Sequence, residues 1–199
     1  EKDTTRARAN ALRHYITSPD SLPQTDLMSA FDLCISCKAC KRECPSNVDV
    51  SSFKAELTYQ YYKKHRRPLR DYVIANNDKI NSFFRHIPQL YNFGSQAEFL
   101  SQSVKKLIGF HPKRSLPKLS TQTFEQYLKS NPKSQSDKSK SNKTVYLFID
   151  EFTNRLEADI GKDAFELLTA LGYNVKYLDN KQSGRAFLSK GFLEQAKAV

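Results

Sequence analysis

The feature that most constrains this chain is a short run that holds all of its cysteines. The four follow the spacing C-x₂-C-x₂-C-x₃-C, with a proline directly after the last: Cys34, Cys37, Cys40 and Cys44. Thiols this close in sequence must bind a common group or remain reduced and crowded. The spacing is that of bacterial [4Fe–4S] ferredoxins, in which cysteines two residues apart wrap one corner of a cuboidal cluster. The segment from Phe31 to Val50 is therefore predicted to bind an iron–sulfur cluster.

The fourth cysteine of such a run has its own role, because in two-cluster domains it ligates the other cluster. We therefore expect Cys34, Cys37 and Cys40 to hold one [4Fe–4S] cluster and Cys44 to ligate a neighbouring cluster. The other ligands of that neighbour would precede Glu1, so this chain alone holds a full set for neither cluster. Three cations are interleaved with the cysteines: Lys38, Lys41 and Arg42. They should raise the cluster potential by stabilising the reduced, more negative form.

Other uses of the cysteines are less well supported. A structural zinc site usually takes two cysteine pairs separated by a longer loop, and no second pair or nearby histidine is present. Disulfides belong to oxidising compartments, and cysteines two residues apart on a tight loop pair poorly. Zinc and unliganded thiols stay open as alternatives that metal analysis separates.

The charge and composition of the chain limit the classes of partner that it can bind. The 199-residue chain carries a net charge of +11, which permits contact with nucleic acid, an anionic membrane face or an acidic protein. Tyrosines beside the basic residues of 59–70 support an alternative function, a nucleic-acid-binding protein with a structural cluster. Their helical spacing with Phe53 and Leu57 favours core or docking surface instead, and many of the lysines lie in 129–143. We therefore do not expect nucleic acid to be the partner.

No signal peptide or membrane-spanning stretch is evident. Clustered cysteines indicate a reducing, cytoplasmic setting.

The fold class predicted from the hydrophobic periodicity is mainly α, with a helical ferredoxin-like [4Fe–4S] domain followed by an incomplete α/β piece of βαβα order. Residues 1–128 form the helical iron–sulfur domain, since helices are expected over 1–17, 22–33, about 53–64 and 71–110, the last broken at Pro88. The Ser, Asn and Lys-rich tract 129–143 is a flexible linker. Residues 144–199 begin a truncated α/β domain, in which strands 144–149 and 173–178 alternate with helices 158–171 and 185–199.

Four stretches in this order resemble one enzyme family. They are TTRARANALR (Thr4 to Arg13), CISCKACKRECPSNVDV (Cys34 to Val50), LFIDEFTN (Leu147 to Asn154) and SGRAFLSKGFLEQAK (Ser183 to Lys197). The chain resembles the carboxyl-terminal half of FAD-linked 2-hydroxyacid oxidoreductases of the D-lactate dehydrogenase and glycolate oxidase type. In that family a flavin domain comes first, followed by a helical domain with two cluster motifs and a cysteine-rich α/β domain like that of heterodisulfide reductase.

The resemblance implies an electron-transfer role. The parent would oxidise a hydroxyacid at FAD and pass electrons singly through two clusters to a downstream acceptor. Implied partners are the flavin domain of the same chain or a flavoprotein subunit, and contact with the inner face of the membrane is compatible with them. No flavin site can be assigned to these residues, so the fragment alone is expected to be inactive. The upstream cluster motif would precede Glu1, and the later cysteines of the α/β domain would follow Val199.

Overall fold

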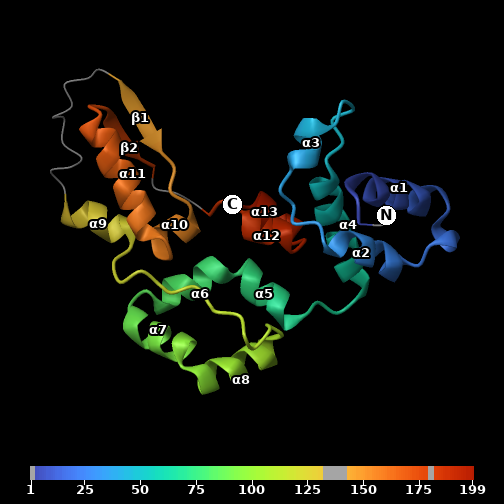
Figure 1. Ribbon diagram of the computed structural model, residues 1–199, viewed down its shortest axis with the longest axis horizontal. Coiled ribbons are helices and arrows are strands. Elements are labelled where there is room, and N and C mark those ends of the chain that lie inside the picture. Colours follow the sequence, from blue (N-terminus) through green and yellow to red (C-terminus); the bar gives the residue numbers. More distant parts are fainter. Residues whose placement is uncertain (1–2, 132–142, 179–181) are drawn as a thin grey trace. The chain divides into compact units, whose positions relative to one another are not determined.

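The computed structural model describes residues 3–131, 143–178 and 182–199 (Figure 1). Contacts within the chain define two compact units, one made of Glu1–Ala75 with Gly184–Ala198 and the other of Asn76–Ser183 with Val199. Helices dominate the described residues, and the strands there form a single pair, so the mainly α prediction is confirmed. The predicted domains, 1–128 and 144–199, are parts expected to fold independently. The contacts do not test independent folding, so these domain limits stay a prediction. Most of the predicted linker, 132–142, lies outside the described residues.

The first unit is helical throughout its described part. Its elements are α1 (Thr5–Thr17), the short 3₁₀ helix η1 (Pro19–Ser21), α2 (Gln24–Asp32), α3 (Ala39–Glu43), α4 (Val50–Lys64), α5 (Leu69–Ala75), α12 (Arg185–Ser189) and α13 (Leu193–Lys197). Thr4 caps α1, because its hydroxyl accepts a 3.1 Å hydrogen bond from the Ala7 N–H. The core lies between α2 and α4, where Leu27, Phe31 and Val50 are almost fully buried.

The predicted single helix over 185–199 is wrong, since the segment forms two short helices with Gly191 between them. Gly191 has a φ of +66°, a left-handed conformation that does not continue an α-helix. Its Cα also lies so close to α4 that a Cβ would stand 2.8 Å from the Tyr59 backbone nitrogen. Phe187 and Phe192 anchor the segment in a cluster with Ala75. Although α12 and α13 are last in sequence, α12 packs against α5 and α13 against α4 within the first unit (Figure 1).

The second unit combines helices with the strand pair. Its elements are α6 (Asn77–Phe84), α7 (Pro88–Gln96), α8 (Glu98–Ile108), α9 (Phe124–Ser130), β1 (Thr144–Leu147), α10 (Glu151–Arg155), α11 (Ala158–Ala170) and β2 (Asn174–Tyr177). The strands run parallel in a register from Thr144 opposite Asn174 to Leu147 opposite Tyr177, as the β-α-β pattern predicted. Both are slightly shorter than expected.

Helix α10 was not predicted. Asp150 caps this helix, because its carboxylate accepts a 2.8 Å hydrogen bond from the Thr153 N–H. Glu151 is the first residue of the helix.

The core of this unit gathers around Phe124, which has no exposed surface. It packs with Ile149, Phe165 and Val175, and therefore joins α9 to α11 and the strands. In contrast, the large apolar residues of α8 are mostly exposed: Phe99 is 86% exposed and Leu107 80%. Helix α8 instead buries Ser101 and Lys105, and Lys105 Nζ donates to the Pro112 carbonyl at 3.4 Å. The hydrophobic period located this helix but did not identify its buried face.

Candidate metal centre

The cysteine run forms the connection between α2 and α4 in the first unit. Helix α2 ends at Asp32, and the Cys34 N–H donates to the Phe31 carbonyl at 3.0 Å, which places Cys34 one turn beyond the buried Phe31 ring. Cys40 lies in the five-residue helix α3 and packs against the core of the unit. The Cys44 N–H closes α3 with a 3.0 Å hydrogen bond to the Cys40 carbonyl. Local hydrogen bonds thus fix the first, third and fourth cysteines.

The loop contains an unusual concentration of left-handed backbone. Ser36, Lys38 and Asn47 have φ values of 57°, 61° and 55°, and two of these three residues lie between cysteines. A non-glycine residue in this conformation costs about 1–2 kcal/mol, although asparagine tolerates it better. Such strain indicates that the loop is shaped for a purpose. Ser36 and Lys38 lie on either side of Cys37, so the backbone changes direction on both sides of this cysteine.

The side chains of the cysteine run are of the type that binds iron–sulfur clusters. All four cysteines are free in the structure, and Cys37 is exposed while the other three are half-buried. Cysteine thiolates are the donors that hold [4Fe–4S] clusters, and in this run the first three are expected to serve one cluster and the fourth its neighbour. Among the residues that the structure describes, however, no three His, Cys, Asp or Glu side chains are gathered tightly enough to hold one ion. The structure places the predicted ligands on one loop without bringing their side chains together.

Asp49 fixes the exit from the loop. Its carboxylate accepts hydrogen bonds from the Ser51 hydroxyl at 2.6 Å and from the Ser52 N–H at 3.0 Å, and so caps α4. The bond from Ser51, joined by those from Ser52, lowers the Asp49 pKa to about 2 although burial opposes the shift. Lys41 Nζ lies 4.0 Å from the same carboxylate, so one of the interleaved cations faces the helix cap.

Two further cations hold the end of α2, and the sequence analysis missed both as parts of the site. Arg8 of α1 is buried and donates through Nε to the Ala30 carbonyl at 2.8 Å. Lys54 of α4 is half-buried and donates through Nζ to the Cys34 carbonyl at 2.6 Å and the Asp32 carbonyl at 3.1 Å. A signal for Lys54 was present, because it lies four residues after Val50 and three before Leu57 on the apolar face of α4.

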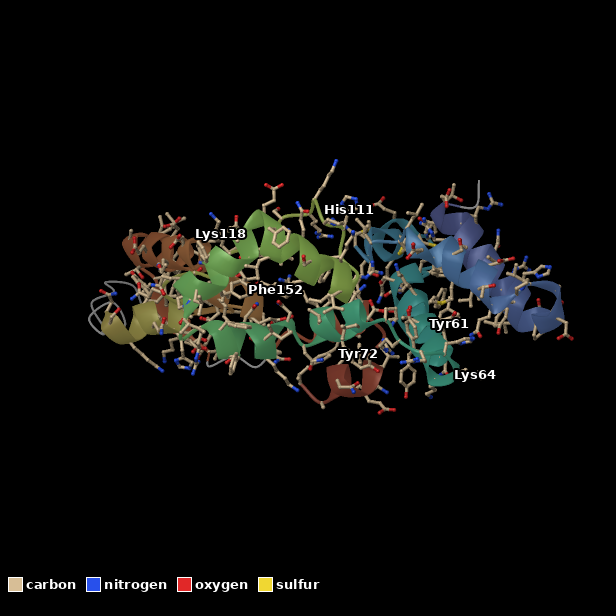
Figure 2. The ribbon with its side chains drawn as sticks, turned by 90° about the horizontal axis from the view of Figure 1, so that it is seen from below. Tyr61, Lys64, Tyr72, His111, Lys118 and Phe152 are labelled. Carbon is tan, nitrogen blue, oxygen red and sulfur yellow. The ribbon has the colours of Figure 1, made fainter. Side chains whose placement is uncertain are left out.

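The aromatic and basic run that suggested nucleic acid is engaged within the first unit. The Arg67 guanidinium lies 3.9 Å from the Phe192 ring centroid and donates to the carbonyls of Lys190 and Gly191. Lys63 Nζ lies 4.2 Å from the Tyr59 ring centroid. Near the end of α4, where Figure 2 labels Tyr61 and Lys64, the Tyr61 ring stacks on His65 with centroids 4.0 Å apart. These contacts account for much of the run without a partner.

Comparison with known proteins supports a link to dehydrogenases. D-2-hydroxyglutarate dehydrogenase of Haemophilus influenzae is 29% identical over 175 residues, which cover 85% of this chain and 17% of that protein. The enzyme of the same name from Escherichia coli is 28% identical over 181 residues, with the same coverage. One subunit of the anaerobic glycerol-3-phosphate dehydrogenase of Escherichia coli is 26% identical over 154 residues, which cover 77% of this chain and 38% of that polypeptide. No model of a protein family and no solved structure matches.

The names of these relatives, dehydrogenases of a 2-hydroxyacid and of glycerol 3-phosphate, confirm the resemblance to 2-hydroxyacid oxidoreductases. The chain spans only 17% of the length of the hydroxyglutarate dehydrogenases it matches. The matched segment is therefore a small part of each of these enzymes, and their activity as whole proteins cannot be located in it by similarity alone.

Proposed function

We propose that this chain is the iron–sulfur electron-transfer part of a FAD-linked oxidoreductase. The observation that carries the proposal is the run of four free thiols on one strained loop, in a chain whose relatives are dehydrogenases. The match to a separate dehydrogenase subunit supports a module that works beside a flavoprotein, whether as part of one chain or as its own polypeptide.

In this proposal Cys34, Cys37 and Cys40 hold three irons of one [4Fe–4S] cluster, and Cys44 ligates a neighbouring cluster. Cys44 follows the last residue of α3, whereas Cys34 and Cys37 precede this helix and Cys40 lies within it, and this different position supports a separate role for Cys44. A bound cluster would supply one-electron transfer, while this chain's residues bind it, space it and set its potential. Lys38 and Lys41 on the loop contribute positive charge that favours the reduced form.

The proposal extends to the parent reaction. A 2-hydroxyacid would be oxidised at FAD in a flavin domain or flavoprotein subunit, and this chain would pass the electrons to a downstream acceptor. The named substrates of the relatives, D-2-hydroxyglutarate and glycerol 3-phosphate, support a small hydroxylated acid or phosphate as the substrate class.

A reducing compartment and a peripheral contact with the inner face of the membrane complete the proposal. No helix in the described part of the chain is both long and apolar enough to span a bilayer. Helix α8 supports a surface contact, because Phe99 and Leu107 are exposed and the nearby Lys106 adds positive charge. Co-sedimentation with anionic but not neutral vesicles is expected, and equal recovery with both would contradict it.

Metal analysis of the chain purified without oxygen tests the central part. We expect iron and acid-labile sulfide in equal amounts, with a rhombic or axial EPR signal after reduction. Stoichiometric zinc with no sulfide would refute the proposal and favour a structural site. Retention on DNA at near-physiological salt without a redox-active cluster would favour the nucleic-acid alternative.

A further inference from the structure

The end of α2 is held by side chains from two other helices. An α-helix leaves its last carbonyls without partners inside the helix, and a lysine or arginine can satisfy them. Here Arg8 of α1 donates to the Ala30 carbonyl at 2.8 Å, and Lys54 of α4 donates to the Asp32 carbonyl at 3.1 Å. The same ammonium group reaches beyond the helix to the Cys34 carbonyl at 2.6 Å. Lys54 is thus a tether between the core helix α4 and the first cysteine.

The contact of Lys54 with the Asp32 and Cys34 carbonyls requires partial desolvation of its ammonium group, and this free-energy cost indicates a specific role. Lys54 is half-buried on the face of α4 that also carries the buried Val50 and Leu57. A lysine on an apolar helix face loses hydration that a methionine of similar length would not need. The desolvated charge is offset by two carbonyl hydrogen bonds, both made to the segment that delivers Cys34.

We propose that Lys54 is a positioning residue for the metal centre. It fixes the backbone of Cys34 and, when a cluster is bound, favours its reduced form through its positive charge. The first part concerns this chain alone, and the second part rests on the proposed function. Lys54 differs in this from Lys38 and Lys41, which are exposed on the loop, because its ammonium group is held in place by the fold.

A second lysine of α4 separates the effect of losing a positive charge from the effect of losing the contacts of Lys54. Lys64 is exposed and ten residues after Lys54, about 15 Å along the helix axis. The variants Lys54→Met and Lys64→Met remove the same charge, but only the former removes the contacts with Asp32 and Cys34. Lys54→Arg keeps a cationic donor and serves as the rescue variant.

The first measurement needs no metal. In the reduced chain without cluster, the alkylation rate of Cys34 is compared with that of the exposed Cys37 in the same molecule by peptide mass spectrometry. Lys54→Met is expected to raise the Cys34 rate about tenfold relative to Cys37, since two charge-assisted hydrogen bonds that restrain the loop are lost. Lys64→Met should leave the ratio unchanged, and Lys54→Arg should restore most of it. An equal ratio in Lys54→Met and Lys64→Met would overturn the positioning role.

The second measurement is an EPR-monitored redox titration of the reconstituted cluster. Lys54→Met is expected to shift the reduction equilibrium about tenfold toward the oxidised form, about 59 mV for a one-electron couple, and Lys64→Met much less. Equal shifts in the two variants would refute the local electrostatic role. If wild type takes up no cluster after reconstitution without oxygen, the electrostatic part of the proposal fails, while the alkylation ratio still decides the positioning role.

If Lys54→Met does not fold, the proposal can still be tested with a second variant. Circular dichroism identifies it, and Lys54→Gln then replaces Lys54→Met, because glutamine keeps a neutral donor. This variant should lower the potential while changing the alkylation ratio less than Lys54→Met does. A wild-type potential in a folded, cluster-containing Lys54→Gln chain would overturn the electrostatic part.

Discussion

Replacing Gly191 with alanine should detach the carboxyl-terminal helices α12 and α13 from the first unit. Gly191 has a φ of +66°, so any other residue there pays about 1–2 kcal/mol for a left-handed backbone. A Cβ would also stand 2.8 Å from the Tyr59 nitrogen and 2.8 Å from Thr58 Cγ2. Because the first of these atoms is backbone inside α4, it cannot move aside without shifting the helix. Overpacking of this kind costs about 1–3 kcal/mol more.

Gly172 provides a matched control in the second unit. Its φ is +86°, but nothing lies within 4 Å of the position that a Cβ would take. Gly172→Ala should therefore cost only the backbone strain, about 1–2 kcal/mol. The difference between the two variants measures the close approach of Gly191 to α4 alone.

Hydrogen exchange followed by mass spectrometry is the suitable assay, since it reports opening segment by segment. In Gly191→Ala, amides of 184–198 should lose about 5–150-fold more protection than amides around Gly172 lose in Gly172→Ala, the factor that about 1–3 kcal/mol implies. Equal losses in the two variants would refute the reasoning, as would full protection of 184–198 in Gly191→Ala.

Three other outcomes follow from the same structure. Asp49→Ala should destabilise α4 by about 1 kcal/mol at neutral pH through loss of the cap. Because the Asp49 pKa is lowered from 3.8 to about 2, this contribution is present above pH 4 and should disappear as the pH falls toward 2, where denaturant unfolding of wild type and variant should converge. Phe124→Ala should cost about 3–5 kcal/mol, with the loss of hydrogen-exchange protection confined to 76–183, since Phe124 is fully buried there. The 199 residues alone should not reduce a dye with D-2-hydroxyglutarate or lactate, and turnover by the purified chain would contradict the assignment of the chemistry to a flavin partner.

Local signals predicted most helices and both strands. The caps at Thr4 and Asp49 and the left-handed Gly172 after α11 are short-range features, and short-range rules locate them. The cysteine run was likewise readable, because its spacing reflects the size of the group it is proposed to hold.

What the sequence could not supply depends on contacts between distant segments. Gly191 stood in a helical pattern, and only its approach to Tyr59 shows why the helix breaks there. Arg67 and Gly191 are 124 positions apart, so no local rule pairs them. The position of Lys54 on the apolar face of α4 indicates burial, but its partner, the Cys34 carbonyl 20 positions away, follows from no local rule. Helix α8 shows the converse, because a clear apolar period there does not mark the buried face.

Reconstitution of this chain with iron and sulfide in the absence of oxygen tests the central claim most directly. Wild type, Cys37→Ser and Cys44→Ser are compared by iron and sulfide content and by EPR after reduction. We expect an oxygen-labile cluster that forms in wild type and in Cys44→Ser with the same signal, and that is lost in Cys37→Ser. A stable [4Fe–4S] cluster that requires Cys44 would contradict the ligand assignment, and zinc bound in place of iron would contradict the electron-transfer role itself.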